Sequence, residues 1–320
     1  MDSVRQSCNS KGLRVVTSPQ EQLLPIVHKL KGYEQTYKLI GQLKQNYIVA
    51  FVETECNLDN GQLPSVIVLY DYTIGHVSMF TNDIDMFDNV ISTIKWDQGF
   101  LVPFKGHPDI DWETIGKHKS KLDLNDIRLE NYTFPAVSLI QEPILRQYLV
   151  RDGFQVTNPG GEFDSYCLQF VDINEKLLEL NSILDGTECL LNIDDAVLVD
   201  ERWAYKNGEE SLALMQFCCT QKISAGYRVK DQDGVSKLVS WIILYSDGSI
   251  GSLHSEDEYR GKGYARKVCS SIIKQLLEKE AIPFLFIKTT NIPSQKLMTS
   301  FGFAPTIVVK WLHAHHKHHQ

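Results

Sequence analysis

The 320-residue chain lacks three features that mark broad protein classes. Its seven cysteines include no C-x-x-C pair and are odd in number, which argues against a complete disulfide framework and favours reduced thiols. Its longest uncharged apolar run, around Leu238–Tyr245, is far too short to span a bilayer. Basic residues number 32 against 40 acidic ones, a net charge of −8. We therefore expect a soluble protein with neither membrane nor nucleic-acid partners.

The first residues also lack a targeting signature. Met1–Cys8 has no apolar signal core, so a cytoplasmic location is expected. A mitochondrial location is the alternative, because Arg5, Lys11 and Arg14 resemble the cations of a presequence, although Asp2 counts against it.

Histidines are concentrated in the last eight residues, 313–320, which contain five of them. Such a tract can bind metal, but it has neither carboxylates nor thiols nearby. We expect a solvated tail and no specific metal site.

The length allows two domains, since single cores seldom exceed roughly 250 to 300 residues. The element order in the first half loosely echoes that of the second, so a duplication is an open interpretation. We place the domains at residues 1–180 and 181–312, with a boundary near 174–186. For the first half the patterns predict a helix at Pro19, strands at 47–54, 65–70 and 74–80, helices at 83–94 and 142–153, and a strand at 154–157. For the second half they predict helices at 194–203 and 209–219, strands at 222–229, 238–245 and 249–254, a helix at 263–279 and a strand at 283–289.

The stretch Arg260–Ala265 lies where a predicted strand gives way to a predicted amphipathic helix. A helix start carries unpaired N–H groups and partial positive charge, and glycines let a phosphate come close to them. A nucleoside triphosphate loop would need Ser or Thr after Lys262, but Gly263 follows. A dinucleotide loop would need a small residue where Arg266 stands. The loop therefore predicts a phosphate site of another kind.

Arg260, Gly263 and Ala265 match an Arg-x-x-Gly-x-Ala pattern. About 30 residues later come the predicted strand 283–289, an Asn-x-x-Ser segment and a Gly-Phe turn. These motifs resemble the GNAT superfamily of acyl-CoA N-acyltransferases. The run 257–260, with 197–203 and Trp241, resembles the glycine N-acyltransferase branch. The resemblance covers residues 185–312 and is faint before them.

The resemblance implies a mixed α+β fold of GNAT type, with two tandem halves of which only the C-terminal one carries the coenzyme A loop. It implies an acyl-CoA-dependent N-acyltransferase that uses acetyl-CoA or another acyl-CoA as co-substrate, with no metal. The acceptor would be a small amine such as glycine or another amino acid. A peptide N-acetyltransferase and a non-catalytic coenzyme A-binding protein are the alternatives, and the oligomeric state stays open.

The resemblance also implies where the co-substrate binds. The amides of Gly261–Ala265 would hold its diphosphate, with cationic side chains beside them. The candidate binding residues are Leu253, Ser255, Arg260, Gly261, Lys262, Gly263, Tyr264, Ala265, Arg266, Asn291 and Ser294.

Acyl transfer from a thioester to an amine needs a base, a polarised carbonyl and a proton for the thiolate. Glu258 and His254 are two open candidates for the base, and N–H groups within Leu253–Ser255 would polarise the carbonyl. Met298 stands where many superfamily members have an acidic tyrosine, so water or Ser294 would supply the proton. A carboxylated acceptor would need a cation, for which Arg202, Arg228 and Lys288 are unranked candidates.

Overall fold

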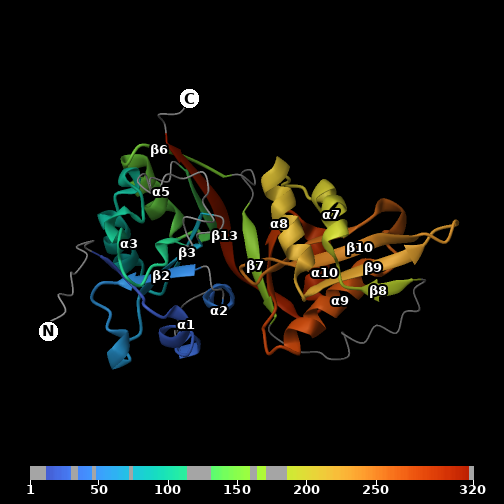
Figure 1. Ribbon diagram of the computed structural model, residues 1–320, viewed down its shortest axis with the longest axis horizontal. Coiled ribbons are helices and arrows are strands. Elements are labelled where there is room, and N and C mark those ends of the chain that lie inside the picture. Colours follow the sequence, from blue (N-terminus) through green and yellow to red (C-terminus); the bar gives the residue numbers. More distant parts are fainter. Residues whose placement is uncertain are drawn as a thin grey trace. The chain divides into compact units, whose positions relative to one another are not determined.

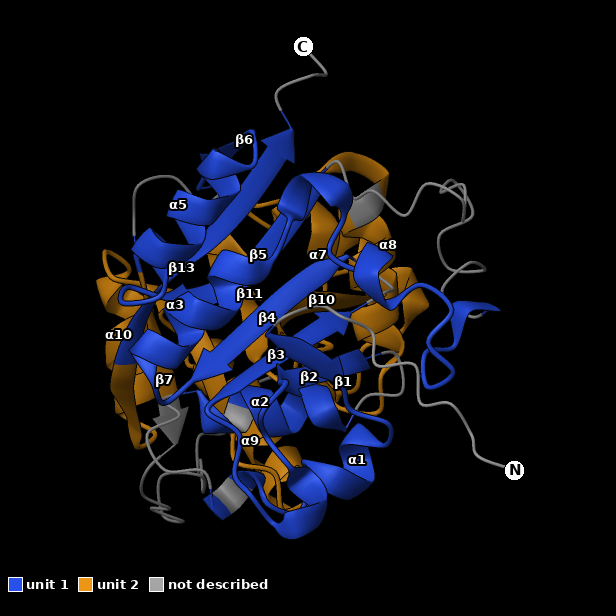
Figure 2. Ribbon diagram, turned by 90° about the vertical axis from the view of Figure 1, so that its left-hand side faces the viewer, with its two compact units in different colours: residues 1–164, 307–320 blue, residues 165–306 orange. Residues whose placement is uncertain are grey.

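The structure is a computed structural model that describes residues 12–29, 35–44, 48–71, 75–113, 131–158, 164–170 and 186–316 (Figure 1). The chain forms two compact units (Figure 2). Unit 1 contains Met1–Asp164 together with Ile307–Gln320, and unit 2 contains Ser165–Thr306. In the described part of the chain, no helix has both the length and the apolar character that crossing a bilayer requires.

Unit 1 is a mixed sheet with helices on both faces. Its strands follow the order β1-β2-β3-β4-β5-β13, and β6 pairs with β13. The strands are β1 (Leu13–Val15), β2 (Ile48–Glu53), β3 (Val66–Asp71), β4 (His76–Thr81), β5 (Asn131–Ser138), β6 (Phe154–Thr157) and β13 (Phe303–His316). The helices are α1 (Pro19–Gln22), α2 (Thr36–Leu43), α3 (Ile84–Thr93) and α5 (Glu142–Arg151), with single 3₁₀ turns at Val27–Lys29, Leu58–Asn60, Trp96–Gln98 and Val102–Phe104.

Alternating side chains of the central strands supply two cores in unit 1. On β3, Val68 and Tyr70 join the core that contains residues of α3 and α5, whereas Ile67 and Leu69 join the core that contains residues of α2 and Leu23, which follows α1. Successive side chains of a strand point to opposite faces, so these strands are apolar throughout. β4 and β5 are the parallel pair of this unit, in register at His76 and Thr133.

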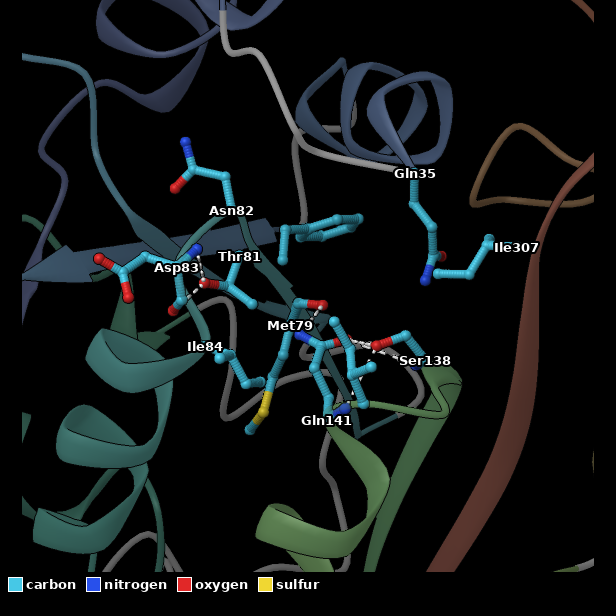
Figure 3. Close-up of a pocket in the computed structure, with 11 residues that line it drawn as sticks. Gln35, Met79, Thr81, Asn82, Asp83, Ile84, Ser138, Gln141 and Ile307 are labelled. Atoms are coloured by element: carbon cyan, nitrogen blue, oxygen red, sulfur yellow. Dashed lines mark hydrogen bonds between the residues drawn. The ribbon is translucent and has the colours of Figure 1, made fainter.

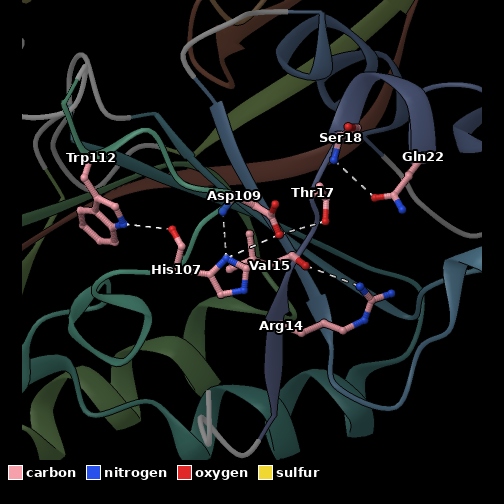
Figure 4. A network of polar contacts seen from close by, with 8 residues as sticks. All are labelled: Arg14, Val15, Thr17, Ser18, Gln22, His107, Asp109 and Trp112. Atoms are coloured by element: carbon pink, nitrogen blue, oxygen red, sulfur yellow. Dashed lines mark hydrogen bonds and ion pairs between the residues drawn. The ribbon is translucent and has the colours of Figure 1, made fainter. Parts of the chain in front are cut away.

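A polar network fixes the segment after β1 to the loop after α3 (Figure 4). Thr17 Oγ1 donates to Asp109 Oδ2 at 3.1 Å, and the Asp109 N–H donates to His107 Nδ1 at 3.3 Å. Trp112 Nε1 donates to the His107 carbonyl at 3.3 Å. These bonds give backbone and ring donors partners where no strand supplies them.

Unit 2 repeats the same arrangement of elements. Its strands follow the order β7-β12-β11-β10-β9-β8. The strands are β7 (Ser165–Phe170), β8 (Thr187–Cys189), β9 (Ser224–Lys230), β10 (Ser236–Leu244), β11 (Ile250–Ser255) and β12 (Phe284–Lys288). The helices are α7 (Ala196–Arg202), α8 (Gly208–Thr220), α9 (Tyr264–Leu277) and α10 (Ile292–Thr299), with 3₁₀ turns at Ile193–Asp195 and Asp257–Tyr259.

Each face of the unit 2 sheet has its own core. Val268 and Ile272 of α9 pack with Val239 and Ile242 on one face. The other face packs Trp241 against residues of α7 and α8. The amphipathic stripe of α9 thus lies on the sheet, as its 3.6-residue periodicity predicts.

Unit 1 is completed by a strand from beyond its main segment, whereas β7 is the first strand within the segment of unit 2. β7 comes directly after unit 1 in the chain and pairs with β12 of unit 2. The later part of β13 pairs with β5 and β6 of unit 1, with Val309 opposite Ser138 and His313 opposite Thr157. The backbone groups of β5 and β6 therefore pair with a strand near the end of the sequence.

The compact units consequently have different bounds from the predicted domains at 1–180 and 181–312. The chain enters unit 2 at Ser165 and returns to unit 1 at Ile307, because strand pairing groups these segments. His313–His316 belong to β13, whereas we expected a solvated tail from 313 to 320. Residues 317–320 and most of the predicted boundary at 174–186 lie outside the described residues.

The mixed α+β fold class is confirmed, and most predicted elements are found within two or three residues of their expected ends. Two helix starts differ from prediction. The helix at Pro19 is only four residues long, and Ser18 makes no side-chain cap bond there. The turn before α7 is capped by Asn192, whose side chain accepts from Asp194 N, and Asp195 returns a bond to the Asn192 N–H. Asn192 completes this capping box, a role we had expected of Asp194 or Asp195.

Candidate functional site

The candidate site begins where β11 and β12 separate. These strands run parallel and are in register only at Ile250 and Leu285. No described residue of β12 is in register with the later residues of β11. On its other side β11 contains a bulge, since Trp241 pairs with His254 and Ile243 pairs with Gly251. The extra residue belongs to β11. It bends that strand and changes the direction of its side chains where β11 and β12 separate.

The start of α9 lies immediately beyond this strand. Gly263 at the N-cap has a φ of 96° and makes no side-chain cap bond, and Gly261 has a φ of 73°. Both φ values favour glycine, because a residue with a Cβ atom is sterically strained when φ is positive. Gly261, Lys262 and Gly263 are exposed, and a Cβ added at Gly261 would meet no atom within 4 Å. The first N–H groups of α9 thus follow directly on an exposed loop and have no side-chain cap, which is what an anion site requires.

The basic side chains of this loop have different partners. Arg260 Nη2 lies 2.9 Å from Asp257 Oδ1, and its Nε donates to the Ser255 carbonyl at 3.1 Å. Arg266 points elsewhere, since its Nη1 donates to Ser300 Oγ at 2.7 Å and its guanidinium lies on the Phe301 ring.

Lys262 remains at the loop. Its ammonium lies 5.2 Å from the centre of the Tyr259 ring, and it forms no ion pair with a described residue. Tyr259 also meets Tyr264, which is buried at the first position of α9. Lys262 is therefore the loop cation best placed to contact an anion. Arg260 bonds to other residues of the loop, and Arg266 bonds to Ser300 at the end of α10.

The two sides of β11 carry different groups. Leu253 packs with the α9 core. His254 stacks on Trp241, with ring centres 4.7 Å apart and planes at 26°, on the face that α7 and α8 cover. Burial lowers the pKa of His254 below its ordinary 6.5, and the charges of Arg260 and Arg202 act in the same direction. A neutral imidazole near pH 7 follows, and it can accept a proton.

Glu258 lies in the exposed 3₁₀ turn Asp257–Tyr259, whereas Glu256 is only partly exposed. Glu256 pairs with Arg202 Nε at 3.1 Å, and this contact joins the loop to the end of α7. The structure therefore brings His254, and not Glu258, against the sheet beside the gap.

Ser255 and Ser240 lie behind the loop. Ser240 Oγ donates to the His254 carbonyl at 2.8 Å and lies 2.8 Å from Ser255 Oγ. These bonds, with that from Arg260 to the Ser255 carbonyl, fix the backbone whose N–H groups were predicted to polarise a carbonyl.

An aromatic cluster borders the gap on the α7 and α8 face. Tyr245 Oη lies 2.7 Å from Ser252 Oγ in the bulge, and Ser252 has a φ of 49°. Burial raises the pKa of Tyr245, so this phenol stays protonated. Trp203 contacts Tyr205, with ring centres 5.7 Å apart. Sequence reasoning missed Tyr205 and Tyr245, because a tyrosine in a helix connection or at a strand end has no distinguishing pattern.

The three candidate cations for a carboxylated acceptor lie in different places. Arg228 contacts Asp195, and Arg202 contacts Glu256. Lys288 lies at the end of β12, and its ammonium is 5.1 Å from the centre of the Tyr205 ring. The neighbouring Ile287 faces the α9 core, so Lys288 faces the side that carries His254.

Asn291, Ser294 and Met298 lie on α10. Asn291 Oδ1 accepts the Ser294 N–H at 3.2 Å, so Asn291 is the helix cap. Ser294 is partly exposed. Met298 is 2% exposed and belongs to the α9 core, so neither its chemistry nor its position suits proton donation.

Comparisons with known proteins agree with this geometry. Residues 226–312 match the family model described as FR47-like protein. Glycine N-acyltransferase-like protein 2 of Homo sapiens is 30% identical over 114 residues. That alignment covers 35% of this chain and spans 37% of the relative's length. Unit 2 is therefore similar in sequence to the FR47-like family and to this human relative.

One solved structure extends the likeness in fold to the whole chain. A Drosophila melanogaster protein has a TM-score of 0.69 at 16% identity, and the match covers 94% of this chain and 97% of that one. A tandem GNAT protein from the clavulanic acid biosynthesis pathway has a TM-score of 0.48 at 13% identity, covering 95% and 98%. The described residues of the two units contain no group of three or more metal-ligating side chains placed to share an ion.

Proposed function

We propose that unit 2 transfers an acyl group from an acyl-CoA thioester to a small amine. The observation that carries this proposal is the start of α9, where left-handed Gly263 ends an exposed loop and leaves the helix N–H groups without a side-chain cap. A diphosphate would accept those N–H groups, with Lys262 adding a charge-assisted contact. The separated strands β11 and β12 would receive the extended chain of the co-substrate.

The acyl carbonyl would lie against the bulged backbone of Leu253–Ser255. Fixed N–H donors there would stabilise the negative charge that develops on the carbonyl oxygen. The amine nitrogen attacks the carbonyl carbon, the C–S bond breaks, and the amine loses one proton while the thiolate gains one. We assign the amine proton to His254, whose lowered pKa keeps it neutral near pH 7. Water or Ser294 would protonate the thiolate, since Met298 lacks the chemistry.

The acceptor would approach on the α7 and α8 face, where His254, Tyr205 and Lys288 lie. The name of the human relative supports an amino acid such as glycine as acceptor. In that case Lys288 would bind the acceptor carboxylate and raise specificity for it.

A thiol-release assay tests the proposal. The protein is mixed with acetyl-CoA and longer acyl-CoAs against a panel of glycine, other amino acids, simple amines and a lysine peptide. Thiol release that depends on a small amine supports the proposal, and release only with the peptide would favour peptide acetylation. Coenzyme A binding without release under any condition would overturn the transferase assignment and leave a binding protein.

A further inference from the structure

Unit 1 contains a cavity of about 220 Å³ at the ends of β4 and β5 (Figure 3). It lies beside the start of α3, so it occupies the same place in unit 1 as the proposed acyl-CoA site does in unit 2. Its lining combines apolar and neutral polar side chains with a single carboxylate. The lining residues are Gln35, Met79, Phe80, Thr81, Asn82, Asp83, Ile84, Ser138, Ile140, Gln141 and Ile307.

The start of α3 cannot bind a diphosphate as the start of α9 would. Asp83 Oδ1 accepts the N–H groups of Asp85 at 3.1 Å and Met86 at 3.0 Å. The carboxylate therefore takes the donors that an anion would use, and its charge repels a second anion. Any ligand of this cavity differs in chemistry from the nucleotide end of coenzyme A.

The polar edge of the cavity is formed by one side of α2. Gln35 and Lys38 are 5% and 1% exposed, and they donate to two consecutive carbonyls of β5. Gln35 Nε2 bonds the Ala136 carbonyl at 2.6 Å, and Lys38 Nζ bonds the Pro135 carbonyl at 2.7 Å. Gln35 Oε1 is buried and accepts no hydrogen bond from any described residue. In Figure 3 the Gln35 side chain reaches down toward Ile307 on the border of the cavity.

A buried acceptor without a donor is costly, so a molecule that brings an N–H group to it removes part of that cost on binding. We propose that this cavity is a second binding site, specific for small uncharged amides. The amide N–H donates to Gln35 Oε1, and the attached alkyl chains lie against Ile84, Ile140 and Ile307.

The charges around the cavity select an uncharged ligand. Asp83 at the start of α3 disfavours an anion, and the ammonium of Lys38, one turn beyond Gln35 and buried, disfavours a cation. The volume admits roughly seven or eight heavy atoms, taking about 30 Å³ for each by comparison with liquid water. A secondary amide with two short alkyl groups satisfies these conditions.

The decisive experiment compares an amide with its ester isostere. N-ethylbutanamide and ethyl butanoate have the same number of heavy atoms and nearly the same shape, but only the amide has an N–H group. NMR titration of the full chain should give saturable shifts at unit 1 residues with a Kd on the order of a millimolar for the amide, and about tenfold weaker binding for the ester. Equal binding of both would overturn the hydrogen bond to Gln35.

Two variants separate this site from a merely hydrated cavity. In Gln35→Leu the preference for the amide should disappear, because the lone acceptor is gone. Since that change also removes the bond to Ala136, Ile140→Trp provides a second test that leaves α2 intact. Ile140 is 59% exposed and lines the cavity, so a tryptophan there blocks the mouth and should weaken amide binding by about tenfold or more.

The matched control is Leu139→Trp. Leu139 is 41% exposed, adjacent to Ile140 in the chain, and not part of the lining. This variant should bind the amide as the native chain does. Absence of saturable shifts with the native chain, or equal weakening in both tryptophan variants, would show that the cavity holds water only and would end the proposal.

Discussion

The two units start their central helix in opposite ways. In unit 2, Gly263 adopts a left-handed conformation before α9 and leaves the first N–H groups without a side-chain partner. In unit 1, Asp83 adopts an extended conformation before α3 and binds two of them with its carboxylate. One helix start therefore offers partial positive charge to a ligand, and the other has already neutralised it. A shared element order thus does not imply a shared ligand.

The strand before each helix differs too. β11 is bulged against β10, with Ser252 in the left-handed region, whereas β4 pairs with β3 in unbroken register. Four residues beyond the parallel pair, unit 2 has His254, which stacks on a tryptophan, and unit 1 has Phe80 in an apolar core. The candidate base, a bulge in the strand before the central helix and the open helix start occur together in unit 2, and β4 and the start of α3 have none of them.

Giving α9 the aspartate cap that α3 has should have the largest effect on coenzyme A binding. Gly263→Asp places a carboxylate at the start of α9, and aspartate tolerates the left-handed region better than most residues. It should weaken coenzyme A binding on the order of a thousandfold, because two charge-assisted hydrogen bonds are lost and a like charge is added. Isothermal titration with coenzyme A measures this loss.

Gly263→Asn is the matched control, since it has nearly the same size and no charge. It should bind clearly better than the aspartate variant, and the difference between the two should shrink at high salt. If both variants bind like the native chain, the start of α9 is not the diphosphate site.

Replacing the candidate base should have the next largest effect. His254→Gln removes the proton acceptor and should lower kcat by about a hundredfold, with unchanged coenzyme A affinity. Glu258→Gln alters an exposed side chain and should leave kcat within about threefold. Because the pKa of His254 lies below 6.5, activity of the native chain should fall only as the pH drops through that lower range. A large loss in Glu258→Gln alone would reverse the assignment.

The sequence predicted unit 2 better than unit 1 for a physical reason. A loop that must leave its backbone open to an anion restricts several positions at once, and Gly261 and Gly263 display that restriction in the sequence. The polar contacts of α2 depend on what β5 offers about 100 residues later, as with Gln35 and Ala136. No local pattern records such a pairing.

The strand partners of β7 and β13 could not be predicted for the same reason. Each is an ordinary apolar strand, and only the register shows that Val309 lies opposite Ser138 and Ile287 opposite Tyr166. Lys288 was named from the sequence, but its place beside Tyr205 depends on the connection between α7 and α8.

A third prediction concerns acid stability, which should differ between the units. His76 begins β4 at the parallel pair, and burial, with the charge of Lys38, lowers its pKa from 6.5 to about 3. The folded state therefore holds it neutral, so its contribution to stability is present above pH 6.5 and is lost as the pH falls toward 3. His76→Gln should flatten the decline in the urea midpoint between pH 7 and pH 4.5. His254→Gln in unit 2 should flatten it less, because the pKa of His254 is lowered by a smaller amount than that of His76.

The smallest effect should come from removing the unit 1 cap. Asp83→Ala should lower the free energy of unfolding by about 1 kcal/mol, because two N–H groups of α3 lose their acceptor. Asp83→Asn keeps an acceptor oxygen and should stay near the native stability in urea unfolding. Neither variant should gain coenzyme A affinity, since α3 would still lack left-handed glycines before it and a bulge in β4. Measurable coenzyme A binding by Asp83→Asn in a chain that also carries Gly263→Asp would show that the cap alone separates the two units.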